Sequence, residues 1–407
     1  YGMHWPYKQH KTSRDQRLLP YHDELKKSGA CFGQSGEYER PMWYALDDNK
    51  AEYEYSFNYQ NWYPSVEHEC KNTIKNVGLF ELSPFAKYEI KGEKAYEELQ
   101  KLCTANIKNE IGKCTYTHML NEGAGIEGDL TTVCIDKNHF RIISSAAVRT
   151  HDKAHILKHL SKHTEFKDVT DDLICLGIFG PKSRELLSKI TNENLSNENF
   201  KFATSKNVRF GSIDIWAQRL SYVGELGYEL YIPKENAKEI YNMIVDTGKQ
   251  FDLSHCGAHT MDTMRMESGF LHWGHDISPE ENQYQAGLSF TISYKKNIDF
   301  IGKEKLLKIK NQKLDKRFVM IVLKENIPGM PLLLNEEPIY LENKIIGKTT
   351  SGNYSFNYNK NLSFGYINSE FSNEQLCHKD IYIEIEKKKY LSQLLLKPLK
   401  KSRFKDI

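Results

Sequence analysis

The sequence predicts an α+β protein that ends in a small all-β unit. Between about residues 60 and 312, apolar strand-like runs alternate with amphipathic stretches of helical period, a pattern typical of packed α+β layers. Beyond about residue 315, only short strand-like runs remain, with no clear helix between them. At 407 residues the chain is also too long for one ordinary core, so we expect two or three packed units.

The first 55 residues differ from the rest of the chain. They are rich in aromatic residues, histidine and turn formers, and their hydrophobic periodicity is poor. We therefore expect residues 1–55 to form an irregular segment that wraps around the protein rather than a domain.

Two similar α+β modules are expected to follow each other over residues 56–312. The elements expected in the first are strands at 77–82 and 87–90, a helix at 93–102, an antiparallel pair at 132–135 and 140–144, and an amphipathic helix at 151–163. Those expected at the start of the second are a buried strand at 174–179, a turn at Gly180-Pro181 and a helix at 182–190. The all-β unit is expected over residues 313–407, with strands at 318–323, 345–350 and 381–386.

Charge and composition exclude several classes of protein. The 56 Lys and Arg nearly balance the 54 Asp and Glu, so the chain lacks the excess of positive charge that is typical of proteins that bind DNA or RNA. No apolar run approaches the roughly 20 residues that cross a bilayer, and the first residues do not resemble a signal peptide. We expect a soluble protein without a membrane partner, located in the cytoplasm or, in a eukaryote, in the mitochondrial matrix. The eight cysteines are dispersed without a C-x-x-C pair, and most of them are expected to be reduced, semi-buried core residues.

A glycine-rich turn at residues 119–131 is the first segment that could carry chemistry. Its glycines allow the backbone to approach a ligand closely, and the turn delivers Asp129 to the start of an apolar strand. A carboxylate at that position can bind an N–H group or accept a proton. The alternative is a hairpin whose aspartate only caps its own turn.

A second segment, at residues 221–231, is strand-like but is interrupted by two glycines. In an extended strand, Glu229 and Tyr231 share one face and Leu230 points to the other. An acid flanked by aromatic rings suits a flat nitrogen heterocycle, because rings stack and a carboxylate accepts two hydrogen bonds from a ring N–H and an exocyclic amine. The alternative is a bulged strand with a solvent-facing glutamate.

A third segment, at residues 264–277, contains His272, His275 and Asp276, and His255 and His259 stand at helical spacing nearby. We expect no metal at either place, because neither group brings the further ligands that a closed site needs. Arg265 and Glu267 are expected to form a structural ion pair.

The sequence also contains no G-x-G-x-x-G after a strand, no G-x-x-x-x-G-K-[ST] and no Ser or Cys nucleophile motif.

In this order and separation, the three segments resemble the glycine-cleavage T-protein (aminomethyltransferase) superfamily over about residues 60 to 407. Two further motifs, Glu39-Arg40-Pro41-x-Trp43 and His272-Trp273-Gly274-His275-Asp276, together with the opening residues 1–6, are similar to the folate-binding C-terminal half of dimethylglycine and sarcosine dehydrogenases. The resemblance implies a cloverleaf of two α+β modules and a C-terminal β-barrel around a folate channel.

The resemblance also implies an activity. In these enzymes an N-methyl amine loses a hydride to FAD, and tetrahydrofolate takes the resulting methylene carbon to become 5,10-methylenetetrahydrofolate. Asp129 stands where the family has its essential acid, and Tyr222 and Glu229 match its pterin-binding Tyr and Glu. The residues expected to line the same pocket are Leu130, Thr131, Leu230, Tyr231 and Phe290.

Two positions depart from the T-protein itself. Gly128-Asp129 stands where the T-protein has two aspartates, and Met261 stands where it has an arginine that helps to hold the folate tail. Both departures fit the dehydrogenase branch. The flavin fingerprint is expected upstream of Tyr1, so FAD is expected only on a missing N-terminal half, either a truncated domain or a separate subunit. Residues 1–55 are expected to be the end of that oxidase half.

Two rival functions remain open from the sequence. One is a folate-dependent methyltransferase of the same superfamily that acts on a sulfonium compound, which the His-Trp-Gly-His-Asp segment disfavours. The other is a folate-binding protein without transfer chemistry, which the joint presence of Asp129, Tyr222 and Glu229 disfavours.

Overall fold

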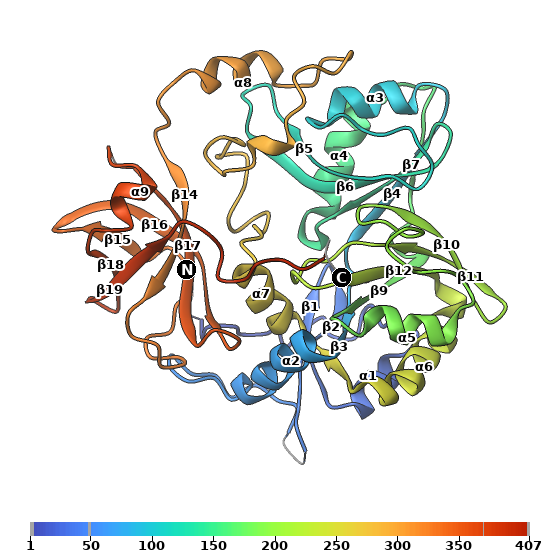
Figure 1. Cartoon of the computed structure of the whole chain (residues 1–407), viewed down its shortest axis with the longest axis horizontal. Coiled ribbons are helices and arrows are strands. Elements are labelled where there is room, and N and C mark those ends of the chain that lie inside the picture. Colours follow the sequence, from blue (N-terminus) through green and yellow to red (C-terminus); the bar gives the residue numbers. More distant parts are fainter. Residues whose placement is uncertain (1–3, 48–49, 369, 405–407) are drawn as a thin grey trace.

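The computed structural model describes residues 4–47, 50–368 and 370–404. Its elements form three lobes around a common centre, with a closed barrel on one side and two mixed lobes on the other (Figure 1). The expected fold class, α+β with two α+β modules followed by a small C-terminal β-barrel, is confirmed. The first three residues of the 1–6 motif lie outside the described residues.

The first mixed lobe is an antiparallel sheet that carries the glycine-rich turn. Helices α3 (Ala95–Leu102) and α4 (Arg149–His159) cover one of its faces and form a core with it. Helix α4 ends earlier than expected, because Leu160 adopts an extended backbone with ψ 144°. Along the sheet, the strands lie in the order β5 (Cys114–Leu120), β6 (Ile126–Asp136), β7 (His139–Ser144), β4 (Ala86–Lys91) and β8 (Glu165–Asp168).

The second mixed lobe is a larger sheet with helices on both faces. One face packs against α5 (Ser183–Ile190) and α6 (Ala237–Gly248), and the other against α2 (Tyr63–Lys75) and α7 (Ala258–Glu267). The strands lie in the order β10 (Ser205–Phe210), β11 (Ile213–Gln218), β12 (Gly227–Pro233), β9 (Leu173–Phe179), β3 (Val77–Glu81) and β13 (Leu253–Cys256).

The two modules do not simply follow each other along the chain. Strand β3 precedes the whole first sheet in sequence, yet it pairs antiparallel with β9 and parallel with β13 in the second sheet. All five residues of β3 are buried, as expected for a strand covered on both faces. The expectation of consecutive modules was therefore wrong for this strand, since a local apolar pattern does not identify the pairing partner.

The barrel follows helix α8 (Lys303–Lys310) and encloses its own apolar core. A four-residue helix, α9 (Asn373–Leu376), interrupts the expected all-β pattern and starts with a capping box between Ser372 and Gln375. Around the barrel, the strands lie in the order β14 (Arg317–Leu323), β17 (Lys360–Ile367), β16 (Lys344–Ser355), β15 (Pro338–Leu341), β18 (Ile381–Ile385) and β19 (Lys388–Leu395).

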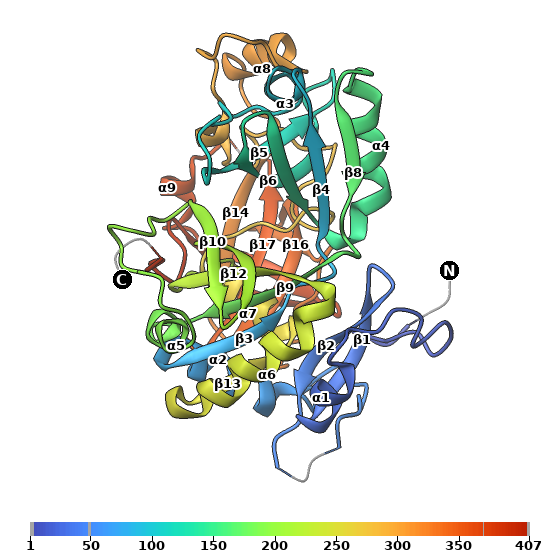
Figure 2. The same ribbon diagram turned by 90° about the vertical axis from the view of Figure 1, so that its right-hand side faces the viewer.

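The N-terminal segment is more regular than expected. It contains helix α1 (His22–Lys27) and a hairpin of β1 (Ala30–Ser35) and β2 (Tyr38–Tyr44). The Glu69 carboxylate fastens the hairpin to α7, because it accepts hydrogen bonds from the backbone N–H of Tyr44 at 2.9 Å and of Gly257 at 2.8 Å. Figure 2 shows the hairpin on the side of the molecule opposite the C-terminus.

Candidate functional site

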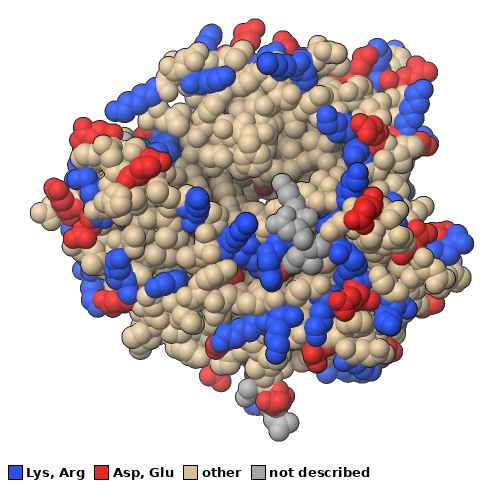
Figure 3. Space-filling view, viewed as in Figure 1, with Lys and Arg blue, Asp and Glu red and all other residues tan. Residues whose placement is uncertain are grey.

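The candidate site lies where the two mixed sheets face each other. Ile143 of β7 packs against the apolar cluster that contains Tyr231 of β12, and the Arg141 guanidinium lies 5.7 Å from the centre of the Tyr231 ring. Figure 3 shows a hollow at the centre of the molecule, bounded in Figure 1 by β6 and the segment that follows α7, with Lys and Arg along its lower rim. The hollow therefore lies beside β6, the strand that carries Asp129.

Asp129 projects from β6 into this region. Its cross-strand partner on β5 is His118, and its Oδ1 lies 3.5 Å from His118 Nε2. Oδ1 is buried and makes no hydrogen bond with the described residues, although the whole side chain is still 16% exposed. Burial raises the pKa of Asp129 to about 7, and the negative charge of Asp152 adds to the rise, while a hydrogen bond from Tyr116 opposes it. The carboxyl group can therefore gain or lose a proton near neutral pH.

His118 is a neutral imidazole beside Asp129. Its side chain is 0% exposed, and burial lowers its pKa to about 3. Its Nδ1 lies 3.1 Å from the Thr291 hydroxyl oxygen, which itself donates to the Leu288 carbonyl at 2.7 Å. The Gln283 amide nitrogen also lies 3.2 Å from Nδ1, and the Tyr116 hydroxyl lies 3.3 Å from Nε2, the ring nitrogen that faces Asp129.

Tyr116 and His118 were missed in the sequence analysis. Both precede the glycine-rich turn, and only the hairpin register places them on the face of Asp129. The alternation of Tyr116 and His118 across one intervening threonine is the signal that indicates a shared face. Tyr116 remains 42% exposed, as expected for a ring at the edge of an open site.

A second acid lies beside the position where the T-protein has an additional aspartate. The Asp152 Oδ1 atom is 3.6 Å from the place that a β-carbon on Gly128 would occupy. Asp152 is 0% exposed, and its carboxylate accepts a hydrogen bond from the Ser144 hydroxyl. Helix α4 thus supplies a carboxylate next to Gly128.

Glu229 and Tyr231 share a face of β12, as expected. The Tyr231 hydroxyl donates to Glu229 Oε2 at 2.9 Å, and burial raises the pKa of Glu229 to about 7. Glu229 is thus half-buried and paired with Tyr231, which disfavours the alternative of a solvent-facing glutamate. Tyr222 is half-buried, donates from its hydroxyl to the Leu271 carbonyl at 2.7 Å and stacks on Phe270 with ring centres 5.9 Å apart.

The remaining expected pocket residues divide into two groups. Thr131 lies between Tyr116 and Ile143 in the register, on the face of Asp129. The side chains of Leu130 and Leu230 point the other way and are buried in the helix-covered cores, because neighbours in a strand face opposite sides. The structure therefore does not bring these two leucine side chains to the site.

Phe290 is 76% exposed. Its link to the site is its neighbour Thr291, which contacts His118. The sequence prediction of a pocket-lining ring at Phe290 remains a prediction.

The third segment holds the barrel in place. Arg265 is 2% exposed, and its Nη1 donates to Asp276 Oδ2 at 2.5 Å and its Nε to Asp262 Oδ1 at 2.8 Å. The expected ion pair between Arg265 and Glu267 was wrong, because residues two apart on a helix point to different sides. Glu267 instead accepts hydrogen bonds from Ser355 Oγ at 2.7 Å and Asn357 Nδ2 at 2.8 Å.

The histidines near this segment have partners other than metals. His255 Nε2 lies 2.7 Å from the Tyr241 hydroxyl, and His259 Nε2 lies 2.8 Å from the Tyr53 hydroxyl. Within residues 4–47, 50–368 and 370–404, no group of three or more His, Cys, Asp or Glu side chains is arranged to hold a metal ion. All eight cysteines are free, and seven of them are buried.

Met261, at the position of the T-protein arginine, lies beside another arginine. The Arg40 Nη2 atom is 3.6 Å from the Met261 sulfur, and the Arg40 Nε–H is buried without a hydrogen-bond partner among the described residues. The N-terminal hairpin thus brings a guanidinium to the place where the family resemblance expects one.

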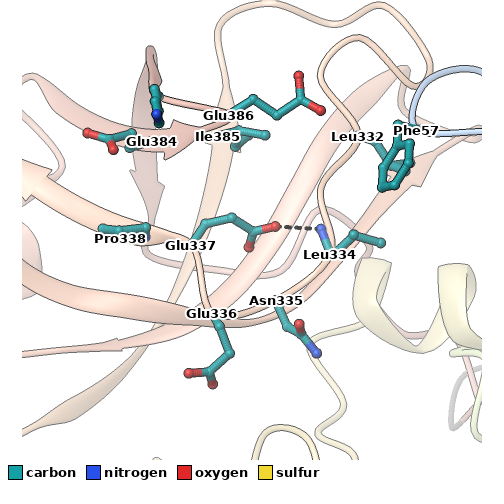
Figure 4. A pocket seen from close by; sticks show the side chains of 11 residues that line it. Phe57, Leu332, Leu334, Asn335, Glu336, Glu337, Pro338, Glu384, Ile385 and Glu386 are labelled. Atoms are coloured by element: carbon teal, nitrogen blue, oxygen red, sulfur yellow. Dashed lines mark hydrogen bonds between the residues drawn. The ribbon is translucent and has the colours of Figure 1, made fainter. Parts of the chain in front are cut away.

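A separate cleft of about 420 Å³ lies between the barrel and Phe57 (Figure 4). Glu337 Oε1 accepts a hydrogen bond from the Leu334 backbone N–H at 2.8 Å across its floor. None of the expected site residues lines this cleft, so it is not the candidate site. Its acidic rim comes from exposed side chains of the barrel.

The carboxyl pKa values predict how stability depends on pH. A buried carboxyl with a raised pKa binds its proton more tightly in the folded chain, so stability falls as pH rises from about 4 through the folded pKa near 7. Glu229→Gln stays neutral at every pH. We expect urea unfolding to show the variant more stable than the wild type by about 1–3 kcal/mol at pH 8, with the difference shrinking toward pH 4. A constant difference across this range would contradict the raised pKa.

Two family models match the chain. The GCVT N-terminal domain matches residues 21–296, and the Glycine cleavage T-protein C-terminal barrel domain matches residues 316–401. The fold also matches the crystal structure of glycine cleavage system aminomethyltransferase T from Bartonella henselae, with a TM-score of 0.81 and 21% identity over 96% of this chain and 99% of that chain.

Three curated proteins are similar to this chain over most of its length. The chain is 38% identical to 4-methylaminobutanoate oxidase (formaldehyde-forming) of Paenarthrobacter nicotinovorans over 87% of this chain and 43% of that protein. It is 31% identical to mitochondrial dimethylglycine dehydrogenase of Rattus norvegicus over 92% of this chain and 43% of that protein. It is 31% identical to an aminomethyltransferase of a Thermoanaerobacter species over 83% of this chain and 90% of that protein.

The chain spans less than half the length of the first two relatives. Among the described residues, no helix combines the length and apolarity needed to cross a membrane.

Proposed function

The chain belongs to the glycine cleavage T-protein family, and on this basis we propose that it transfers one carbon from an oxidised N-methyl amine to tetrahydrofolate, forming 5,10-methylenetetrahydrofolate. It is a folate-dependent aminomethyltransferase-type domain related to dimethylglycine dehydrogenase and 4-methylaminobutanoate oxidase. The observation that carries the proposal is the pair of half-buried acids, Asp129 and Glu229, which lie on the facing sheets and have pKa values raised to about 7.

The side chains around the space fit a reduced pteridine. Glu229 can accept two hydrogen bonds from a ring N–H and an exocyclic amine, and Tyr231 contacts its carboxylate. Tyr222 offers a further aromatic face to a flat ligand. The Asp129 Oδ1 atom is buried and lacks a hydrogen-bond donor among the described residues, so an N–H group of a ligand would satisfy it. We assign Tyr222, Glu229 and Tyr231 to folate binding and Asp129 to catalysis.

The reaction releases a proton that a group of the protein must accept. Tetrahydrofolate, when bound, supplies the nitrogen nucleophiles. In the net reaction the methylene carbon exchanges its bond to the amine for bonds to two folate nitrogens, and two N–H protons are released. One proton leaves with the demethylated amine, and Asp129 accepts the other. A carboxylate with a pKa near 7 suits this role, because it is basic enough to take the proton and acidic enough to return it to solvent.

Oxidation of the amine requires a flavin. We assign this step to an FAD-dependent half that precedes this chain or forms a separate subunit. Relatives whose names describe oxidation of N-methyl amines are more than twice as long as the part of them that this chain matches, which supports the assignment. The amine itself is a small N-methylated compound of the dimethylglycine or sarcosine class.

The proposal is tested by measuring product. The purified chain is mixed with tetrahydrofolate, dimethylglycine and a separate flavin oxidase that converts dimethylglycine to its iminium. We expect 5,10-methylenetetrahydrofolate to form faster than the background reaction of tetrahydrofolate with released formaldehyde. A rate equal to that background would contradict transfer activity and favour a folate-binding protein without chemistry.

Glu229→Gln is expected to weaken tetrahydrofolate binding by about 10–100-fold. The amide keeps the shape of the side chain but replaces one acceptor oxygen with a donor that opposes the pteridine N–H, which corresponds to about 1–3 kcal/mol. Fluorescence titration measures the change. Glu185→Gln, an exposed residue of α5 in the same lobe, is the matched control and is expected to bind like the wild type.

A further inference from the structure

Gln218, the last residue of β11, is a fully buried amide without a partner. Its side chain is 0% exposed, and neither its nitrogen nor its oxygen makes a hydrogen bond with the described residues. Nearly all buried amides in folded proteins are paired, because an unpaired one destabilises the fold. An unpaired buried amide is therefore a sign that a ligand completes its hydrogen bonds.

Gln218 lies on the same face as Glu229. The two residues stand directly opposite each other in the β11–β12 register, and Trp216 stands opposite Tyr231 two positions away. Opposed residues in an antiparallel pair project to the same side of the sheet. The Trp216 indole N–H is also buried and has no hydrogen-bond partner among the described residues.

This face is the one that meets the first sheet. Ser205, the partner of Gln218 on β10, donates from its hydroxyl to the Gly112 carbonyl at 3.1 Å, two residues before β5 begins. The negative charge of Glu229 also acts on the Cys114 thiol at the start of β5. Gln218 is thus enclosed between the two sheets, at the end of the site away from His118 and Asp129.

We propose that Gln218 and Glu229 together hold the pyrimidine end of a 2-amino-4-oxopteridine, with Gln218 on the edge formed by ring atoms N1 and N8. This inference rests on the proposed function and names a residue that determines which state of the ring binds. A carboxylate accepts hydrogen bonds only, which suits the N3–H and 2-amino donors. A primary amide offers one donor and one acceptor side by side, which suits N1 as acceptor and N8–H as donor.

The assignment makes Gln218 sensitive to the reduction state of the ligand. Tetrahydrofolate carries a hydrogen on N8, so both amide atoms of Gln218 are satisfied. Folic acid has no hydrogen on N8, so a lone pair would face the amide oxygen and that hydrogen bond would be lost. Gln218 therefore favours the reduced folate.

The test is Gln218→Met, which keeps the length of the side chain and removes the amide. We expect calorimetric titration to show tetrahydrofolate binding weakened about tenfold, and folic acid binding weakened less than about threefold. In the free chain the melting temperature is expected to rise by about 1–3 °C, since an unpaired buried amide is removed. If Gln218 only stabilised the fold, its replacement would lower the melting temperature.

Gln60→Met is the matched control. Gln60 is also buried, at 1% exposed, but its amide nitrogen donates to the carbonyls of Ser56 at 2.9 Å and Asn58 at 2.8 Å. We expect this variant to melt at a lower temperature than the wild type and to bind tetrahydrofolate with unchanged affinity.

Different outcomes contradict the assignment of Gln218 and the proposed function. A wild type that binds tetrahydrofolate and a Gln218→Met variant that binds it equally well would overturn this inference alone. A lower melting temperature or a failure to fold, in both Gln218→Met and Gln218→Leu, would also overturn it, because the amide would then have a structural partner. A folded wild type that does not bind tetrahydrofolate would overturn the proposed function as well.

Discussion

Asp129→Asn is expected to slow the formation of 5,10-methylenetetrahydrofolate by about 10²–10⁴-fold, the usual contribution of a positioned acid or base. The amide keeps the size of the carboxyl group but cannot accept a proton. Because the amide oxygen can still accept a hydrogen bond from the ligand N–H and Glu229 is unchanged, tetrahydrofolate is expected to bind within about threefold of the wild-type affinity. Stopped-flow measurement of product, with the iminium supplied by a separate oxidase, gives the rate.

Asp136→Asn is the control for this experiment. Asp136 ends the same strand as Asp129 but is exposed, and among the described residues its carboxylate accepts a hydrogen bond only from the Lys137 backbone N–H. The control is expected to react at the wild-type rate. A normal rate in Asp129→Asn, with folate bound, would show that another group handles the proton.

Arg265→Leu is expected to lower the free energy of unfolding by about 3–5 kcal/mol, since it leaves the buried Asp276 carboxylate without its charged partner. Asp276 is 1% exposed and also accepts hydrogen bonds from Thr350 at 2.6 Å and Ser351 at 2.7 Å, both in β16. The Arg265–Asp276 pair thus joins α7 to the barrel. Guanidinium chloride unfolding measures the loss.

Arg209→Leu is the matched control for the ion pair. Arg209 pairs with Asp214 at 2.8 Å, but the two side chains are 64% and 53% exposed. An exposed pair contributes at most about 1 kcal/mol, so this variant is expected to be nearly as stable as the wild type. Similar losses in both variants would contradict the role given to the buried pair.

Much of the fold follows from local patterns in the sequence. The expected strand at 174–179 and helix at 182–190 agree with β9 and α5 to within one residue, since both have a clear apolar period and a Gly-Pro turn between them. The pairing of β3 does not follow from local patterns, because its partners β9 and β13 are about 100 and 175 residues away in sequence. Any buried apolar strand also fits the centre of a sheet equally well.

Local sequence patterns also identify only part of the candidate site. Asp129, Tyr222 and Glu229 were expected because their segments, in this order and separation, resemble the T-protein family. His118 and Gln218 were not found, because each becomes part of the site only through a cross-strand partner, Asp129 for the first and Glu229 for the second. Leu130 and Leu230 were assigned to the pocket as neighbours of site residues, although adjacent side chains of a strand point to opposite faces.

Calorimetric titration of the wild-type chain with tetrahydrofolate at pH 7.5 tests the central claim most directly. We predict saturable binding of one tetrahydrofolate per chain, at a site that Glu229→Gln weakens. A folded wild-type chain that shows no heat of binding at saturating tetrahydrofolate would contradict the claim that the space between the two sheets is a folate site.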